Sequence, residues 1–385
     1  MKHKIYPILL HFTLLGLSLS ALLSCTNRKE EVVVVATQHP NPYNITVPQF
    51  FPTQMNIPAD NPLTVEGIKL GRYLFYDGRL SGRTESDSLM SCSTCHLQSN
   101  SFECGVNNFD NGHPFGLSGI PTQHSMLPLI NLVWNNSGYT WNGAVYNGNP
   151  TTNNRTLEDI VLIVIQLPSE INGSAQKTVE TIASIPIYPP MFEAAFGSPE
   201  VNIDRICKAI AQFIRTLISS NSKFDKYMRG EVQLSTQELN GLVLFTTEQG
   251  ADCFHCHGGG GNVLFTTNLF YNNAKDSVFN DVGDRFHVTF NTQDIGAYRA
   301  PTLRNIAYTA PYMHDGRFKT LDEVVNFYSE GLVASPYTST FMHKIPNGGA
   351  HLSPQQKSDL IAFLHSLSDE DFINNASFSK PADLP

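Results

Sequence analysis

Two copies of the pattern C-x-x-C-H constrain this chain more than any other feature of its sequence. The first is CSTCH at residues 92–96, and the second is CFHCH at residues 253–257. The two thiols of such a pattern lie a little under one helical turn apart, so both can bond to one porphyrin while the next residue turns its imidazole onto the iron. We therefore predict two covalently bound haem c groups.

The two motifs assign six side chains to haem. Four cysteines form the thioether bonds and two histidines bind the irons: Cys92, Cys95, Cys253, Cys256, His96 and His257. A zinc site made of all four cysteines is one alternative, but the motifs lie far apart in the chain and zinc needs neither trailing histidine. A thioredoxin-like redox pair would need a βαβ context, and structural disulfides rarely bridge a C-x-x-C turn.

The N-terminal residues 1–25 predict an export signal. Basic residues precede a largely apolar run that ends in Leu-Leu-Ser-Cys at Cys25, which resembles the bacterial lipobox, in which the cysteine is acylated. A plain signal peptide with an incidental cysteine is the alternative. Residues 26–45 then form a tether, and no later apolar run is long enough to span a bilayer. We expect an exported, periplasm-facing protein that meets the membrane only through this lipid.

The net charge argues against one class of partner, and two cysteines remain outside the haem motifs. The net charge is −9 and no basic block is present, so we expect no nucleic-acid partner, because phosphate binding needs clustered lysine and arginine. Cys104 and Cys207 lie outside both motifs. They either form a disulfide or remain as two buried thiols, and the sequence leaves both alternatives open.

Helical periodicity predominates along the chain, so the predicted fold class is mostly α. Strand-like alternation is scarce, and the Asn-, Gly- and Pro-rich residues 102–155 predict loops. One haem motif in each half indicates one haem domain each. The predicted boundaries are 46–230 for the N-terminal haem domain, 231–370 for the C-terminal haem domain and 371–385 for a tail.

The segment 314–331 predicts a helix with one buried face. Leu321, Val324, Val325 and Tyr328 fall at positions i, i+3, i+4 and i+7. The helix is expected to begin after Thr320, with Glu323 completing a capping box, and to end at Gly331. By periodicity alone Tyr328 is a core residue.

Longer stretches resemble the bacterial dihaem cytochrome c peroxidases and their relative MauG. The resemblance covers residues 45–370 in order and implies two cytochrome c-like haem domains with long loops. The N-terminal haem would meet peroxide and the C-terminal haem would store or relay an electron. The matching stretches, besides the two haem motifs, are NPLTVEGIKLGRYLFYDGRLS, YTWNGAV, LEDIVLIVIQLPSEING and YRAPTLRNIAYTAPYMHDGRFKTLDEVVNFY.

The resemblance gives Tyr328 a second interpretation. In the peroxidases a methionine at this place is the sixth ligand of the C-terminal haem, and in MauG-like members the place holds tyrosine. No methionine lies on the helix of Tyr328. A phenolate ligand favours oxidised iron, so the resemblance implies a low-potential haem bound by His257 and Tyr328.

The resemblance also implies the groups that handle peroxide. Gln166 and Glu170 match the distal glutamine and glutamate, and Glu170 would be the general acid/base. Trp141 matches the tryptophan between the haems, where an indole can relay electrons; a buried structural tryptophan is the alternative. His113 or His124 is an alternative sixth ligand at the N-terminal haem, although we expect both histidines on the surface.

The family further implies a calcium ion between the haems. Thr309 and Pro311 match the residues that supply carbonyl oxygens, while Ser125 replaces the asparagine that supplies a side-chain oxygen. These oxygen donors are of the kind that calcium prefers. The prediction of a calcium site comes from the resemblance alone.

The function implied is that of a dihaem peroxidase. It would reduce hydrogen peroxide with electrons from a small donor protein of the cytochrome c type. Two alternatives remain: a MauG-like enzyme that oxidises side chains of a partner protein, and a non-catalytic dihaem electron-transfer cytochrome. A homodimer is compatible with each, since the sequence does not give the oligomeric state.

Overall fold

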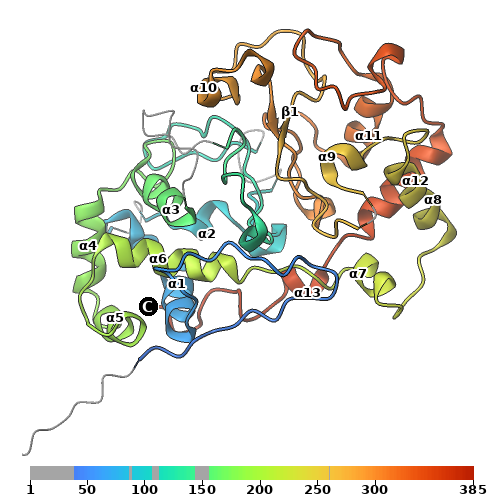
Figure 1. Cartoon of the computed structure of the whole chain (residues 1–385). Helices are drawn as coiled ribbons and strands as arrows, with labels where there is room; N and C mark the ends of the chain where they lie inside the picture. The colour runs from blue at the N-terminus through green and yellow to red at the C-terminus, as the bar shows by residue number, and fades with distance from the viewer. Residues whose placement is uncertain (1–38, 86–88, 106–111, 144–155, 260) are drawn as a thin grey trace, which may run out of the picture. The chain divides into compact units, whose positions relative to one another are not determined.

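The computed structural model describes residues 39–385 apart from 86–88, 106–111, 144–155 and 260 (Figure 1). This part of the chain is mostly helical, as predicted. Its helices are α1 (Val65–Tyr76), α2 (Cys92–Cys95), α3 (Leu157–Gln166), α4 (Ala175–Ser184), α5 (Tyr188–Phe196), α6 (Ile203–Arg215), α7 (Lys223–Met228), α8 (Thr236–Thr246), α9 (Phe254–His257), α10 (Phe286–Thr289), α11 (Leu321–Glu330), α12 (Pro354–His365) and α13 (Glu370–Ile373). The strands β1 (Phe270–Tyr271) and β2 (Tyr298–Arg299) pair antiparallel. None of the described helices is long and apolar enough to cross a membrane.

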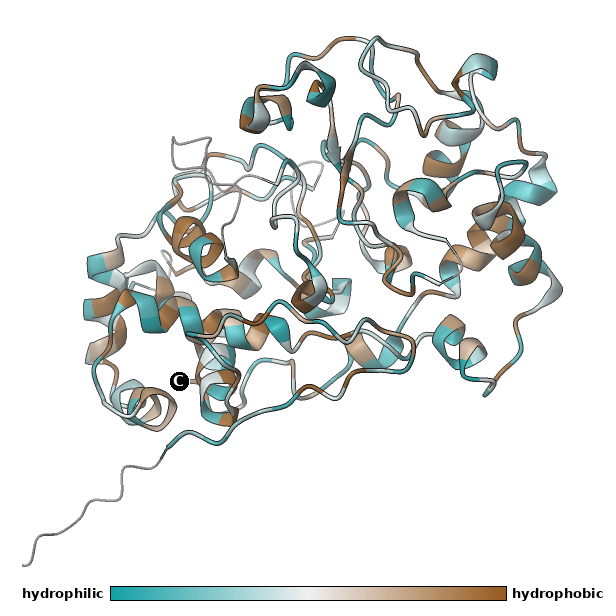
Figure 2. Cartoon of the chain, viewed as in Figure 1, coloured by the Kyte–Doolittle hydropathy of each residue, from teal (hydrophilic) through white to brown (hydrophobic). Residues whose placement is uncertain are grey.

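The first hydrophobic core lies among α1 and α3–α6. Figure 2 shows apolar residues (brown) gathered on α3. The longest of these helices, α6, begins after Asn202, whose side chain accepts a hydrogen bond from the Arg205 amide. Ile206, Ile210 and Phe213 of α6 are buried in this core, and each such side chain contributes about 1.5–3 kcal/mol.

The second core lies among α8, α11 and α12. Both α8 and α12 begin with capping boxes, at Ser235 and Ser353. The rings of Phe245, Phe265 and Phe363 pack against one another with centroids 5.3–6.1 Å apart. Each haem motif follows a helix of its core: α1 precedes the first motif and α8 the second.

A close helix crossing organises each core. A Cβ atom on Gly71 of α1 would lie 1.9 Å from the Ala209 carbonyl oxygen of α6. In the second core, a Cβ atom on Gly241 of α8 would lie 2.0 Å from the Asp359 carbonyl oxygen of α12. Glycine is therefore required at both crossings, because any side chain would push the two backbones apart. Both cores therefore contain a helix pair that crosses closely at a glycine.

The C-terminal residues 371–385, expected as a tail, pack on the first core. Phe372 is buried there. The Arg72 side chain donates hydrogen bonds to the carbonyls of Ala376 and Ser379, and the Tyr73 hydroxyl donates to Asp383. The chain thus returns to its first core after completing the second. The predicted signal peptide, lipidation site Cys25 and most of the tether lie outside the described residues.

We predict that Gly71→Ala destabilises the protein despite the better helix propensity of alanine. Propensity alone would stabilise by about 1 kcal/mol, whereas separating α1 from α6 should cost at least about 2 kcal/mol. Guanidinium chloride unfolding of the haem-loaded protein measures the difference. Gly261→Ala is the control, since no atom lies within 4 Å of its added Cβ. A Gly71→Ala protein as stable as the parent would contradict the close crossing.

Candidate haem sites and active site

In the first haem motif, a short helix and a hydrogen bond to a backbone carbonyl hold the histidine in place. Its cysteines, Cys92 and Cys95, bound the short helix α2, which a capping box at Ser91 begins. The next residue, His96, shares a hydrogen bond of 2.6 Å between its Nδ1 and the carbonyl oxygen of Phe102. Burial lowers the pKa of His96 to about 4. The imidazole is therefore neutral at pH 7, and Nε2 is left to bind a metal.

The second motif reaches the same arrangement with a partner much further along the chain. Nδ1 of His257, the last residue of α9, lies 3.1 Å from the carbonyl oxygen of Pro301. Burial lowers the pKa of His257 to about 4 as well. Both motif histidines thus carry their proton on Nδ1 and keep Nε2 for iron.

A cavity of about 190 Å³ lies against the second motif. On the same measure one water needs only about 10–15 Å³, so the cavity is far larger than a hydration site. Its lining is mainly apolar and includes Cys253, Cys256 and His257. Thiols for covalent attachment, a neutral imidazole and an apolar volume are what a haem c requires, so the residues present fit the group. When bound, haem supplies an iron that cycles between oxidation states.

Tyr328 lines this cavity from α11. The helix begins with the predicted capping box at Thr320, and Leu321 and Val325 of the predicted apolar stripe are buried. The phenol oxygen accepts a hydrogen bond of 3.1 Å from the Asn273 amide. Burial raises the pKa of Tyr328 above its ordinary value, so ionisation would need a cation beside the oxygen. The core and ligand interpretations of Tyr328 are compatible, because its helix packs on one face and lines the cavity with this side chain.

Sequence analysis missed two side chains beside Tyr328. The amide of Asn273 that holds the phenol also lies 3.6 Å from the sulfur of Met313. Met313 lines the same cavity and has a backbone φ of 71°. Met313 stands in the sequence YMHDG, before the helix of Tyr328, so helical spacing does not point to it. The cavity therefore offers both a phenol and a thioether.

Trp141 lines the same cavity from the loop before residue 144. Its indole N–H donates to the carbonyl of Ser125 at 2.7 Å. The ring lies 6.4 Å from that of His314, which stacks on Tyr298 at 3.5 Å. Arg299 fixes the loop by donating to the carbonyls of the neighbouring residues, Ser137, Gly138 and Thr140. The indole is thus held rigidly beside the second motif, as a relay or a structural residue would be.

His113 and His124, expected on the surface, are both partly exposed and each binds a neighbouring loop. His124 is 14% exposed, and its Nε2 lies 2.7 Å from Asp281, whose pKa is held below its usual range partly by this contact. His113 is half-buried and its Nδ1 lies 2.9 Å from the carbonyl of Thr122. Both histidines hold loops together.

The carboxyl of Glu170 lies close to the first motif. Its charge adds to burial in raising the thiol pKa values of Cys92 and Cys95. Burial raises the pKa of Glu170 itself to about 7. Its backbone is fixed on both sides, since its N–H donates to Leu167 and its carbonyl accepts from Leu117. Gln166 ends α3 with an exposed side chain, and its catalytic role stays a prediction.

The calcium ligands predicted from the resemblance lie together on one segment. Thr309 and Pro311 are buried and line the cavity of the second motif. Among the described residues, no donor hydrogen-bonds to either carbonyl oxygen, so both are available to a cation. The hydroxyl of Ser125 donates to the Met313 carbonyl instead. The calcium ion stays a prediction.

Among the described residues, the two cysteines outside the motifs are buried thiols. Cys104 donates to Glu103, and Cys207 lies within α6 in the first core. Of the two alternatives that the sequence left open, the structure has the thiols.

Comparisons with known proteins show the family of the chain. The family model for di-haem cytochrome c peroxidase matches residues 65–233. The methylamine utilization protein MauG of Methylorubrum extorquens is 32% identical over 322 residues, 83% of each chain. The cytochrome c551 peroxidase of Nitrosomonas europaea is 34% identical over 275 residues, 70% of this chain and 74% of its own.

A solved structure of similar extent strengthens the assignment. A MauG-like protein associated with microbial copper homeostasis is 34% identical, has a TM-score of 0.74 and matches 88% of this chain and 99% of its own. The diheme peroxidase BthA of Burkholderia thailandensis, at 20% identity and a TM-score of 0.65, shares the fold. The chain belongs to the family of dihaem cytochrome c peroxidases and MauG proteins. It is an oxidoreductase of the peroxidase type with two cytochrome c-like domains and haem c as its cofactor.

We predict that Tyr328→Phe alters one haem of the two. Removing the phenol oxygen should change the ferric absorption and electron paramagnetic resonance signals of that haem and raise its reduction potential, because a charge-donating ligand favours oxidised iron. Tyr271→Phe is the control: Tyr271 lines the same cavity, but its hydroxyl pairs with Thr267. Unchanged spectra and potential in Tyr328→Phe would make Tyr328 a packing residue only.

Proposed function

We propose that this protein reduces hydrogen peroxide to water with two electrons from a small redox protein such as cytochrome c. Two electrons and two protons convert one peroxide molecule into two water molecules. The observation that carries the proposal is the partly exposed Glu170 carboxyl near the first motif, whose pKa desolvation raises to about 7. The haem held by His96 would supply the position for peroxide and the electrons that reduce it.

Glu170 is suited to move a proton between the two oxygens of peroxide. A group with a pKa near the working pH is both a competent base and a competent acid. As carboxylate, Glu170 takes the proton from the oxygen nearer the iron position, and as carboxylic acid it returns that proton to the departing oxygen. The hydrogen bonds that fix the backbone at residue 170 limit its reorientation between the two steps.

Electrons would reach this site from the second domain. Trp141 supports such a route, since it lines the cavity of the second motif and its ring is held by a hydrogen bond to Ser125. A rigid indole loses little energy to reorganisation when it relays an electron. The net charge of −9 suits a basic donor protein.

A MauG-like role is the second candidate, and Tyr328 favours it. A phenol that lines the cavity of the second haem motif is suited to a haem that stays oxidised and stores oxidising power. Such an enzyme would oxidise side chains of a partner protein instead of a soluble electron donor. The similarity to MauG and to a MauG-like protein supports this candidate.

We further propose that the protein is exported and lipid-anchored at Cys25. The support is the sequence alone: a basic start, an apolar run and a cysteine after a small residue. Covalent haem suits an exported protein, because the cofactor cannot be lost to the medium.

We predict that Glu170→Gln lowers kcat/KM for hydrogen peroxide by about 10²–10⁴-fold, the usual contribution of a general acid/base. In the parent, kcat/KM should rise with pH through an ionisation near pH 7, because the carboxylate form must accept the first proton. The variant should lose this ionisation while retaining both haems. Initial rates of peroxide consumption between pH 5 and 9, at about half-unit steps, measure both effects.

Glu103→Gln is the matched control. Burial raises the pKa of Glu103 to about 7 as well, but its carboxylate accepts hydrogen bonds from Gly105 and Cys104. This variant should keep the pH profile of the parent. If Glu170→Gln retains the profile instead, Glu170 is not the acid/base.

Reduced cytochrome c separates the two candidate functions. We predict that the protein oxidises two molecules of reduced cytochrome c for each peroxide consumed, since peroxide needs two electrons. Stopped-flow absorbance of the donor measures this ratio. Peroxide consumption without donor oxidation would favour the MauG-like candidate.

A further inference from the structure

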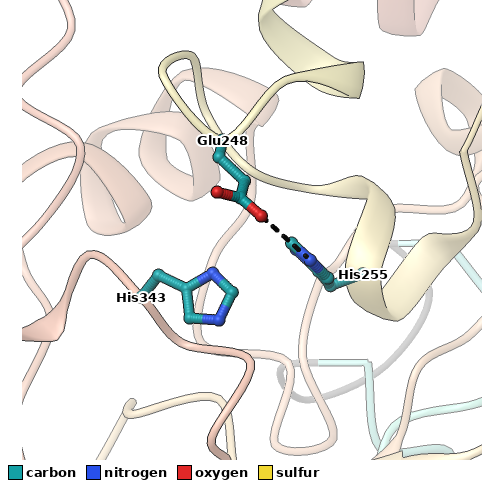
Figure 3. A group of neighbouring side chains, drawn as sticks. All are labelled: Glu248, His255 and His343. Carbon is teal, nitrogen blue, oxygen red and sulfur yellow. Dashed lines mark ion pairs between the residues drawn. The ribbon is translucent and has the colours of Figure 1, made fainter.

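Three metal-binding side chains meet outside the haem-binding residues. Glu248 follows α8, His255 lies within α9 and His343 lies on the loop after α11. One oxygen or nitrogen atom from each lies within 4.8 Å of the others, and Figure 3 shows the three side chains facing one another. Oε1 of Glu248 is 3.8 Å from Nε2 of His255. Three segments separated in sequence therefore present donors to one point.

A buried carboxylate orients both imidazoles. Asp252 is 4% exposed, and its Oδ1 lies 2.7 Å from Nδ1 of His255. Its Oδ2 lies 3.2 Å from Nδ1 of His343. With its Nδ1 directed to this carboxylate, His255 keeps Nε2, the nitrogen near Glu248, for another partner. The contact with Asp252 also fixes where the His343 ring lies. Carboxylates orient metal-bound histidines in proteins in the same way.

Aromatic packing holds His255 in place. Phe341 stacks on its ring with centroids 5.5 Å apart and an interplanar angle of 18°. The ring of His343 meets it edge-on at 4.8 Å and 84°. His255 occupies a position inside the second haem motif that haem attachment leaves without a role. Its ring is only 17% exposed and is held by its neighbours, although covalent haem attachment does not require this side chain to be fixed.

We propose that Glu248, His255 and His343 bind a divalent transition metal ion, either Zn²⁺ or Cu²⁺. Two imidazole nitrogens and one carboxylate oxygen are ligands that both ions accept, whereas calcium prefers oxygen alone. At such a site the Cu²⁺ complex is the tighter one. Asp252 is the positioning residue, and solvent supplies any further ligand.

The distances allow the site to close on an ion. Metal–ligand bonds of about 2.0–2.2 Å place donors about 3.3 Å apart in a tetrahedral site. The present separations of up to 4.8 Å need a shift of about 1–1.5 Å in all, which side-chain rotation supplies. Glu248 and His343 are free to make it, since their side chains are 58% and 43% exposed. His255 would serve as the fixed ligand.

The test is metal binding by the haem-loaded protein. After a chelator wash, we expect isothermal titration with Zn²⁺ and separately with Cu²⁺ to show one ion bound per chain. His343→Asn and Glu248→Gln should each weaken binding by at least about tenfold, as loss of even an orienting partner does. The Cu²⁺ resonance spectrum should show coupling to two nitrogens. Haem absorption, recorded for each variant, checks that the fold and both haems are retained.

His287→Asn is the matched control. His287 is 41% exposed and its Nδ1 lies 2.7 Å from Asp284, so it copies the carboxylate pairing of His343, and in the described part of the chain it belongs to no three-residue donor group. This variant should bind as the parent does. Stoichiometric binding that survives both His343→Asn and Glu248→Gln, or no binding by the parent, would overturn the proposal. If one variant loses haem, the other decides.

Discussion

The hydrogen bond from Nδ1 of each motif histidine to a backbone carbonyl is the constraint on which the rest of the structure depends. It fixes the tautomer, so His96 and His257 each keep Nε2 for iron. Burial lowers both pKa values to about 4, so neither ring is protonated at neutral pH. With cysteines and histidine set on one short turn, these residues would hold each haem at its motif.

The two domains share one kind of helix crossing but place different side chains near their haem motifs. In each, a glycine crossing brings the helix before the haem motif against a later helix of the same core, at Gly71 and at Gly241. The environments then diverge. The first domain brings a carboxyl with a pKa of about 7, Glu170, near the haem cysteines. The second presents the phenol of Tyr328 to an apolar cavity. Under the proposed function the carboxyl would handle protons and a phenolate would stabilise oxidised iron, so the two domains would differ in the side chain that each adds to the shared motif.

Local patterns were predictable from the sequence, and long-range contacts were not. The haem motifs, the helix of Tyr328 and its cap at Thr320 follow from spacing and periodicity. Glu170 came only from the family resemblance, since a loop carboxylate has no periodicity. The partner of His257 lies 44 residues away, and no spacing rule identifies it. The contact of Met313 with Asn273 likewise depends on loop packing, where turn geometry and burial decide and sequence patterns carry little information.

The most direct test is to mix hydrogen peroxide with the fully ferric protein and follow the haem absorption by stopped flow. If peroxide reacts where Glu170 lies and Tyr328 keeps the second haem oxidised, the ferric bands should fall rapidly without any prior reduction. A reaction that begins only after one electron is added would contradict the role of Tyr328 and indicate the ordinary dihaem peroxidase cycle. No reaction in either state would contradict the peroxidase function itself and leave an electron carrier.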